Sequence, residues 1–177
     1  QIGHSHSPFY GSFDGNSKTI THYHLSNPLM GFQGMFGVAL HPAEIRDLTI
    51  TDSSVAGAVF NGILAGHTTG SVDRVTVAGT MTGGYHSGGM IGLARAPGSI
   101  TDCSASTIFS HSGTFNGAGG GLIGNSGVVI RRSLAASTMT GGVNYMGGLV
   151  GYMSTGMILD SMSSGSIGNA GQQRVGG

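Results

Sequence analysis

The chain has 177 residues, of which 35 are glycine and only 8% are charged, and its formal net charge is zero with the histidines neutral. Disordered chains are rich in charge and proline, whereas this chain has 4 prolines and lacks the strict Gly-X-Y period of collagen. It also lacks the basic excess that attracts nucleic acid or an anionic membrane, and no apolar stretch approaches the ~20 residues needed to span a bilayer. The single cysteine, Cys103, excludes an intramolecular disulfide and a cysteine-based metal cluster.

Residues 1–33 differ from the rest of the chain. They are rich in aromatic side chains and lack the glycine-framed motif that follows, as expected of a first coil that covers the end of a repeat stack. We therefore predict an N-terminal capping or first coil over residues 1–33. Residues 34–177 are predicted to form five repeat coils, of which the last is incomplete.

A glycine-framed apolar box returns five times in this second region. The boxes occupy residues 34–37, 62–66, 88–92, 120–124 and 147–151, and their closing glycines are 29, 26, 32 and 27 residues apart. A near-constant period of this size indicates a stacked repeat, in which one unit buries its apolar face only against its neighbours.

Each box is followed by a second apolar stretch, which begins at Ile45, Val72, Ile100, Ile130 and Ile158. These stretches alternate with a period of two and start with β-branched residues, which favours strands. A third apolar position follows at Val55, Met81, Ile108, Met139 and Ile167. The pattern predicts an all-β fold: a parallel β-helix (β-solenoid) of about six coils of 26–32 residues, with three short strands per coil and no helix. The glycines are expected at corners that need a positive φ.

The boxes resemble the GLUG repeat. The resemblance is carried by the Gly-Gly-Leu-Val-Gly box at 147–151, by the Ile-x-Asp segments, by the Ser-x-Ser-Gly-x-Ile tail and by the segment Phe13 to Ile20, and it spans residues 9–177. GLUG-like repeats are known from bacterial surface and secreted proteins, including adhesins and the stalks of some immunoglobulin A peptidases. The resemblance implies a scaffold or stem at the cell surface, and it identifies no ligand.

Five charged residues of alternating sign fall in one column when the second strands are aligned: Asp47, Arg74, Asp102, Arg132 and Asp160. Opposite charges on neighbouring strands can pair. Glycoside hydrolysis would need two carboxylates with one raised pKa, whereas an adjacent arginine lowers the pKa of a carboxyl group. We therefore predict a structural charge ladder, no catalytic residue and no enzymatic activity.

An aromatic residue stands just ahead of four of the boxes: Phe60, Tyr85, Phe115 and Tyr145. Rings spaced ~4.8 Å apart along neighbouring strands could hold sugar rings or an apolar partner. The same rings could equally stack a loop upon itself. The lack of tryptophan favours this second interpretation over a lectin.

Two pairs of histidines, His4 with His6 and His22 with His24, have the spacing that places both rings on one face of a strand. Together they could supply the imidazoles of a zinc or copper site. Apart from Asp14, no carboxylate or cysteine lies nearby in the sequence. Surface histidines are expected, with no metal and no other cofactor.

The chain stops at Val175, Gly176 and Gly177, where the spacing predicts the opening of a sixth box. This coil is expected to be completed either by a longer repeat array or by a second copy, whose N-terminal coil would supply the covering side chains: Phe9, Tyr10, Phe13 and Ile20. The expected function is that of an extracellular stalk, adhesin shaft or filament subunit on a bacterial surface. The alternative is a β-helix that binds or cleaves a polysaccharide along the aromatic column, with a host or matrix glycan as its partner.

Overall fold

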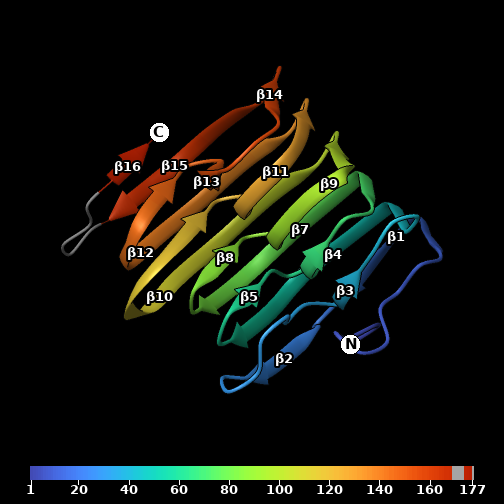
Figure 1. Ribbon diagram of the computed structural model, residues 1–177, viewed down its shortest axis with the longest axis horizontal. Coiled ribbons are helices and arrows are strands. Elements are labelled where there is room, and N and C mark those ends of the chain that lie inside the picture. The colour runs from blue at the N-terminus through green and yellow to red at the C-terminus, as the bar shows by residue number, and fades with distance from the viewer. Residues whose placement is uncertain (169–173, 177) are drawn as a thin grey trace.

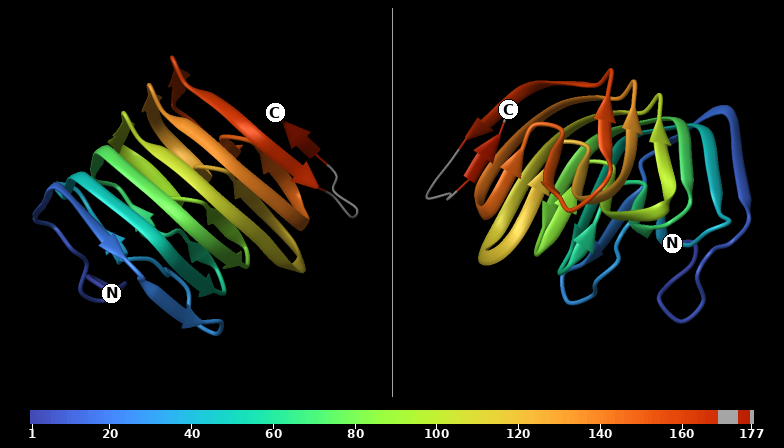
Figure 2. Two further views of the ribbon diagram at one scale, coloured as in Figure 1. Left: turned by 180° about the vertical axis from the view of Figure 1, so that it is seen from behind. Right: turned by 45° about the horizontal axis from the view of Figure 1, so that its top comes forward.

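The computed structural model describes residues 1–168 and 174–176, with the side chains of all of these except 112–116, 143 and 174–176. Sixteen strands form one sheet that winds into a β-solenoid of about five turns, and every pairing between named strands is parallel. The predicted fold class is confirmed. The chain advances steadily along the stack, so that its two ends lie at opposite ends of the solenoid (Figures 1 and 2).

The strands vary from two to 17 residues in length. They are β1 (Ser12–Thr21), β2 (His24–Asn27), β3 (Phe36–Ala39), β4 (Glu44–Gly57), β5 (Phe60–Asn61), β6 (Ala65–Thr68), β7 (Ser71–Gly83), β8 (His86–Gly88), β9 (Ile91–Thr101), β10 (Ser104–Gly120), β11 (Ile123–Arg131), β12 (Leu134–Gly147), β13 (Val150–Met153), β14 (Met157–Leu159), β15 (Met162–Gly168) and β16 (Arg174–Gly176). None of the described segments forms a long apolar helix of the kind that crosses a membrane.

The last coil has only begun where the chain stops. Strand β16 pairs with β12 so that Val175 lies opposite Met146, and Gly176 lies opposite Gly147, the opening glycine of the fifth box. This register agrees with the expected start of a sixth box, although the stack has about five turns rather than six. Gly177 lies outside the described residues.

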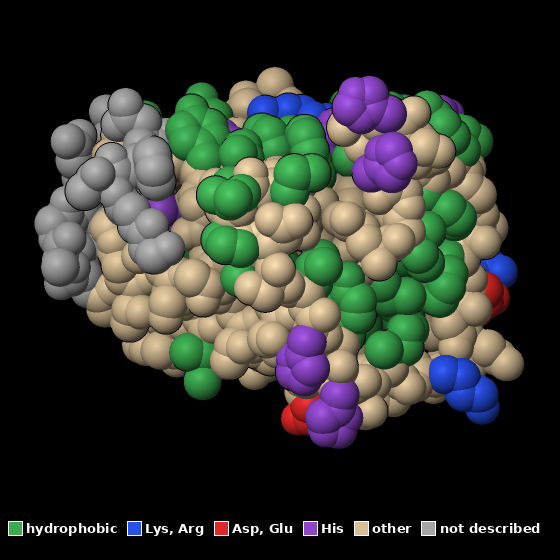
Figure 3. All heavy atoms as spheres, turned by 90° about the horizontal axis from the view of Figure 1, so that it is seen from below, with side chains coloured by type: hydrophobic (Ala, Val, Ile, Leu, Met, Phe, Trp, Pro, Cys, Tyr) green, Lys and Arg blue, Asp and Glu red, His purple; other side chains and the backbone are tan. Residues whose placement is uncertain are grey.

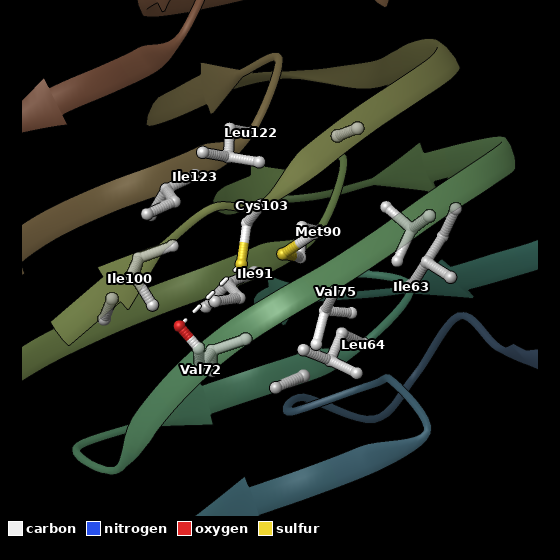
Figure 4. Close-up of a cluster of buried hydrophobic side chains, with 14 of the residues drawn as sticks. Ile63, Leu64, Val72, Val75, Met90, Ile91, Ile100, Cys103, Leu122 and Ile123 are labelled. Atoms are coloured by element: carbon white, nitrogen blue, oxygen red, sulfur yellow. Dashed lines mark hydrogen bonds between the residues drawn. The ribbon is translucent and has the colours of Figure 1, made fainter. Parts of the chain in front are cut away.

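The core is one continuous cluster of inward side chains stacked from coil to coil. One column joins Phe36, Ala65, Ile91 and Ile123, each of which is fully buried. Figure 4 shows part of this cluster, in which the Cys103 Sγ points toward the Val72 carbonyl oxygen at 3.7 Å. Burial raises the pKa of the Cys103 thiol to about 12, so this cysteine is a packing residue rather than a reactive one.

A second core column corrects one sequence-based expectation. Phe109, not Ile108, lies in register with Met81 and Met139. Phe109 is fully buried, whereas Ile108 is 61% exposed and faces outward. Inward and outward positions alternate along β10, so an error of one residue exchanges the two faces.

The glycine boxes also require glycine for a different reason than expected. Positive φ angles among the described glycines occur outside the boxes, at Gly3, Gly79, Gly141, Gly156 and Gly165. The closing glycine of a box instead touches the backbone that leads into the box of the preceding coil. A Cβ atom on Gly124 would lie 2.6 Å from the Ser87 nitrogen, and one on Gly92 would lie 2.7 Å from the Phe60 carbonyl carbon. The boxes are therefore places where two backbones meet without room for a side chain.

Candidate functional site

The positive φ angles that were expected at glycines are found at the charged column. Its five members have φ angles between 44° and 53°: Asp47, Arg74, Asp102, Arg132 and Asp160. Each stands at a left-handed corner within the second apolar stretch, so that the inward residues on either side are three positions apart, as with Ile45 and Leu48. Aspartate visits this conformation more readily than most residues, whereas arginine at the same corner carries a backbone cost.

The corner column is joined by ion pairs between successive coils. Arg74 donates two hydrogen bonds to the Asp47 carboxylate, at 2.7 and 2.9 Å, and Arg132 binds Asp102 in the same way, at 2.7 and 2.8 Å. These hydrogen bonds hold the pKa of Asp47 and that of Asp102 below the ordinary value of 3.8. A general acid needs a raised pKa, so this electrostatic arrangement suits structural pairing rather than acid catalysis.

Replacing Asp102 by asparagine tests the pairing. Asparagine tolerates the left-handed corner but removes the charge. Because the folded-state pKa of Asp102 is lowered, its stabilising effect is present above pH 3.8 and is lost as the pH falls through the folded-state value. We expect Asp102→Asn to lower the melting temperature slightly at pH 7, since exposed ion pairs stabilise little, and to show no difference from wild type at about pH 2.

Thermal unfolding followed by circular dichroism between about pH 2 and 7 measures this difference. Asp52→Asn is the matched control, because Asp52 also has a positive φ of 49° but makes no ion pair in the described part of the chain. A pH-dependent difference of equal size in the control would contradict the assignment to the Arg132 pair.

The predicted aromatic column is wrong as a single column. The register aligns Phe60 with His86, Ala118 and Tyr145, whereas Tyr85 precedes His86 by one residue. The backbone of Phe115 lies opposite Val143, between two register shifts of β10, and its side chain is outside the description. Phe60 and Tyr145 stand two residues ahead of their boxes, whereas Tyr85 and Phe115 stand three and five residues ahead, so the four do not share one position in the stack.

Two members of that set, Tyr85 and Tyr145, nevertheless line one pocket of about 410 Å³. Its other lining residues are His86, Asn125, Asn144 and Tyr152. The Tyr85 ring centroid lies 4.2 Å from that of His86, and the Tyr145 centroid lies 5.2 Å from that of Tyr152. The pocket thus has two pairs of rings, supplied by residues at the ends of β8, β12 and β13.

Sequence reasoning missed Asn125 and Tyr152, although a signal was present. Both directly follow the closing glycine of a box, and the register joins them in one outward column with Leu93 and His67. Alignment on the residue after each box, rather than on the residue before it, would have found them.

The pocket is supported by a hydrogen-bonded arginine. Arg95 donates from Nη1 to the Asn125 Oδ1 at 2.8 Å and to the Ser154 Oγ at 3.1 Å. With its Oδ1 accepting from Arg95, Asn125 turns its Nδ2 toward the His86 Nε2, at 3.2 Å. The imidazole nitrogen must therefore accept, which requires a neutral His86. Burial, with a contribution from the Arg95 charge, lowers the pKa of His86 to about 4 and keeps it neutral.

The paired histidines do not assemble into a cluster. The rings of His4 and His6 lie 6.2 Å apart on the exposed N-terminal segment, while the His24 Nδ1 contacts the Ser54 Oγ at 2.7 Å and His22 stands at an exposed corner. No group of three or more potential metal ligands occurs among the residues that the structure describes. On the face shown in Figure 3, histidines are visible at the surface and charged side chains are few.

The two ends of the solenoid differ in how they are covered. At the N-terminal end, Phe9 and Phe13 pack against Phe36, with ring centroids 5.1 and 5.4 Å apart, and Ile20 packs on the core while Tyr10 is exposed. At the C-terminal end, Ile158 is 41% exposed, although Ile100 and Ile130 in the same column are fully buried. Met157 and Met162 are exposed beside it.

These features define a class: a parallel β-solenoid with an uncovered last coil and a ring-lined pocket on its flank. No family model and no solved structure matches the chain. The chain is similar to part of halomucin from Haloquadratum walsbyi, with 32% identity over 97 residues. The match covers 55% of this chain and 1% of that protein, so the chain spans only a small fraction of its relative's length.

Proposed function

We propose that the chain is a structural and adhesive stem element at the cell surface, whose coil stack is continued end to end by a second copy. The observation that carries this proposal is the exposure of Ile158, at a column position that is fully buried in the two preceding coils. A repeat unit of this kind buries its apolar face only against a neighbour. A coil stacked on this side, from a second copy or from a continuing repeat array, would cover Ile158.

The hydrogen-bonding edge and the charges of the last coil fit the same role. Strands β14 and β15 pair on one side only, with β11 and β12, and an unpaired strand edge is a template for another strand. Asp160 makes no ion pair within the described residues, although each aspartate before it in the corner column is paired with an arginine of the next coil. A following coil with a cation at this corner would complete the alternation.

The N-terminal coil of a second copy is a suitable cover. It presents the half-buried side chains of Phe13, Ile20 and Leu25, and the cation of Lys18 follows its own left-handed corner. Such a head-to-tail contact does not close on itself and so produces a filament. The resemblance to GLUG repeats supports a place outside the cell, and the match to a small segment of the much longer halomucin is compatible with a place in a longer chain.

Sedimentation velocity and electron microscopy of the purified chain test this proposal. Wild type is expected to form rods whose length grows with concentration, whereas Ile158→Glu should remain monomeric because it places a charge in the contact. Ile108→Glu is the control, since Ile108 is 61% exposed on the flank rather than on the end. The proposal is contradicted if the wild-type chain stays monomeric at high concentration. It is also contradicted if the Ile158→Glu variant forms rods of the same length as wild type.

A further inference from the structure

The pocket on the flank is lined by residues of three successive coils. In the strand register, Ala118 lies opposite His86 of the preceding coil and opposite Tyr145 of the following coil. Two strand spacings separate these residues, which makes the hollow about 10 Å long. Its volume of about 410 Å³ falls in the range of small-ligand sites.

The lining combines flat rings with fixed polar groups. Tyr85, Tyr145 and Tyr152 offer ring faces, and each carries a hydroxyl group that can donate or accept a hydrogen bond. The Asn125 amide is held in one orientation by Arg95. A sugar ring matches this set, because its C–H groups can lie on an aromatic face while its hydroxyl groups bond to amides and phenols.

The charge near the pocket is positive. None of the six lining residues is acidic. Arg95 lies behind Asn125 rather than among the lining residues, and its charge acts on the lining residue His86. It makes no ion pair in the described part of the chain, and its Nη1 donates to the neutral oxygens of Asn125 and Ser154. An unneutralised guanidinium beside a partly enclosed pocket attracts an anion more strongly than one in open water.

We propose that this pocket binds an acidic saccharide, with a uronate ring lying against Tyr145 and Tyr152 and its carboxylate drawn toward Arg95. The site is a binding site rather than a hydrolytic one, because glycoside hydrolysis needs two carboxylates at the scissile bond and the lining supplies none. This role adds ligand recognition to the stem and does not depend on end-to-end assembly.

Calorimetric titration with a short oligogalacturonate, and with the neutral oligogalactoside of the same length, tests the proposal. Wild type should bind the acidic oligomer at least about fivefold more tightly than the neutral one, and Tyr152→Ala should weaken binding of the acidic oligomer by about tenfold through loss of one ring. Arg95→Gln should abolish the preference for the acidic oligomer. Arg95→Lys, which keeps the charge but not the guanidinium geometry, should retain most of it.

Tyr10→Ala is the matched control, since Tyr10 is an exposed ring at the N-terminal end, far from the pocket along the chain. Circular dichroism establishes that each variant is folded before titration. The proposal is overturned if neither oligomer binds wild type, if both bind equally, or if Tyr152→Ala binds as wild type does. Rod formation is measured on the same samples, so failure of saccharide binding is distinguished from failure of the stem proposal.

Discussion

Replacing Gly124 by alanine is expected to destabilise the solenoid by more than about 3 kcal/mol, beyond the usual 1–3 kcal/mol for overpacking. The added Cβ atom would lie 2.6 Å from the Ser87 nitrogen and 2.8 Å from the Gly92 oxygen. Both neighbours are backbone atoms of other coils, so no side chain can move aside to make room. Relief requires that the coils separate, which weakens the hydrogen bonds between them.

Urea unfolding followed by circular dichroism measures this loss, with Gly168→Ala as the matched control. A Cβ atom on Gly168 would meet the Thr140 side chain at 3.7 Å and the Met139 oxygen at 3.8 Å, which are ordinary contacts. Gly168→Ala should therefore unfold near the wild-type urea concentration. If the two variants unfolded at the same urea concentration, the close approach at the box would not be what demands glycine there.

The second large effect is expected at Phe109, for which alanine should cost about 3–5 kcal/mol. Phe109 is fully buried between Met81 and Met139 of the adjacent coils, so truncation leaves a cavity that those two side chains can fill only in part. A loss of this size is a large part of the 5–15 kcal/mol that stabilises an ordinary domain. Most molecules of the variant should therefore unfold at mild urea concentrations.

The neighbouring residue supplies the control for this prediction. Ile108→Ala also removes apolar atoms, but Ile108 points outward and is 61% exposed, so this variant should cost less than about 1 kcal/mol. Equilibrium unfolding of both variants in urea gives the two free energies. A greater loss in Ile108→Ala than in Phe109→Ala would mean that the register of β10 is displaced by one residue.

The fold could be predicted because the boxes mark the same point of every coil. Their spacing indicates a stack, and the apolar alternation between them indicates strands, without reference to any single contact. The same marks predicted that Gly176 would stand where a box opens, and its pairing with Gly147 agrees. The corner column was found from the second apolar stretches, since Asp47 and Arg74 each stand two residues after the first residue of their stretch.

The errors arose where a residue of the expected type stands near the aligned position but not at it. Phe109, rather than Ile108, stands nine residues after the start of its second apolar stretch, as Met81 and Met139 do. Tyr85 and Phe115 stand three and five residues ahead of their boxes, whereas Phe60 stands two ahead. Conformation was a second source of error. The high glycine content suggested that glycines would adopt the positive φ angles of the corners. Asp47 and Arg74 adopt them instead, and the box glycines do not.

The pocket could not be predicted from any single repeat. Its walls come from three coils, with His86, Asn125 and Tyr145 each supplied by a different one. The shape of such a pocket depends on differences in side-chain size between neighbouring coils. The repeat pattern of the sequence shows only the features that the coils have in common. The tyrosines and the supporting Arg95 acquire a common location only when the register is known.

The backbone contacts at the boxes also govern how such a protein can change over time. Because Gly92 and Gly124 rest on main-chain atoms, the approach of two coils at the boxes does not depend on which side chains those coils carry there. A coil can then be duplicated, deleted or exchanged without changing this contact, provided that its inward side chains fit the neighbouring core. The box keeps the same backbone contact between every pair of coils, while the residues on the outer face can differ from one coil to the next.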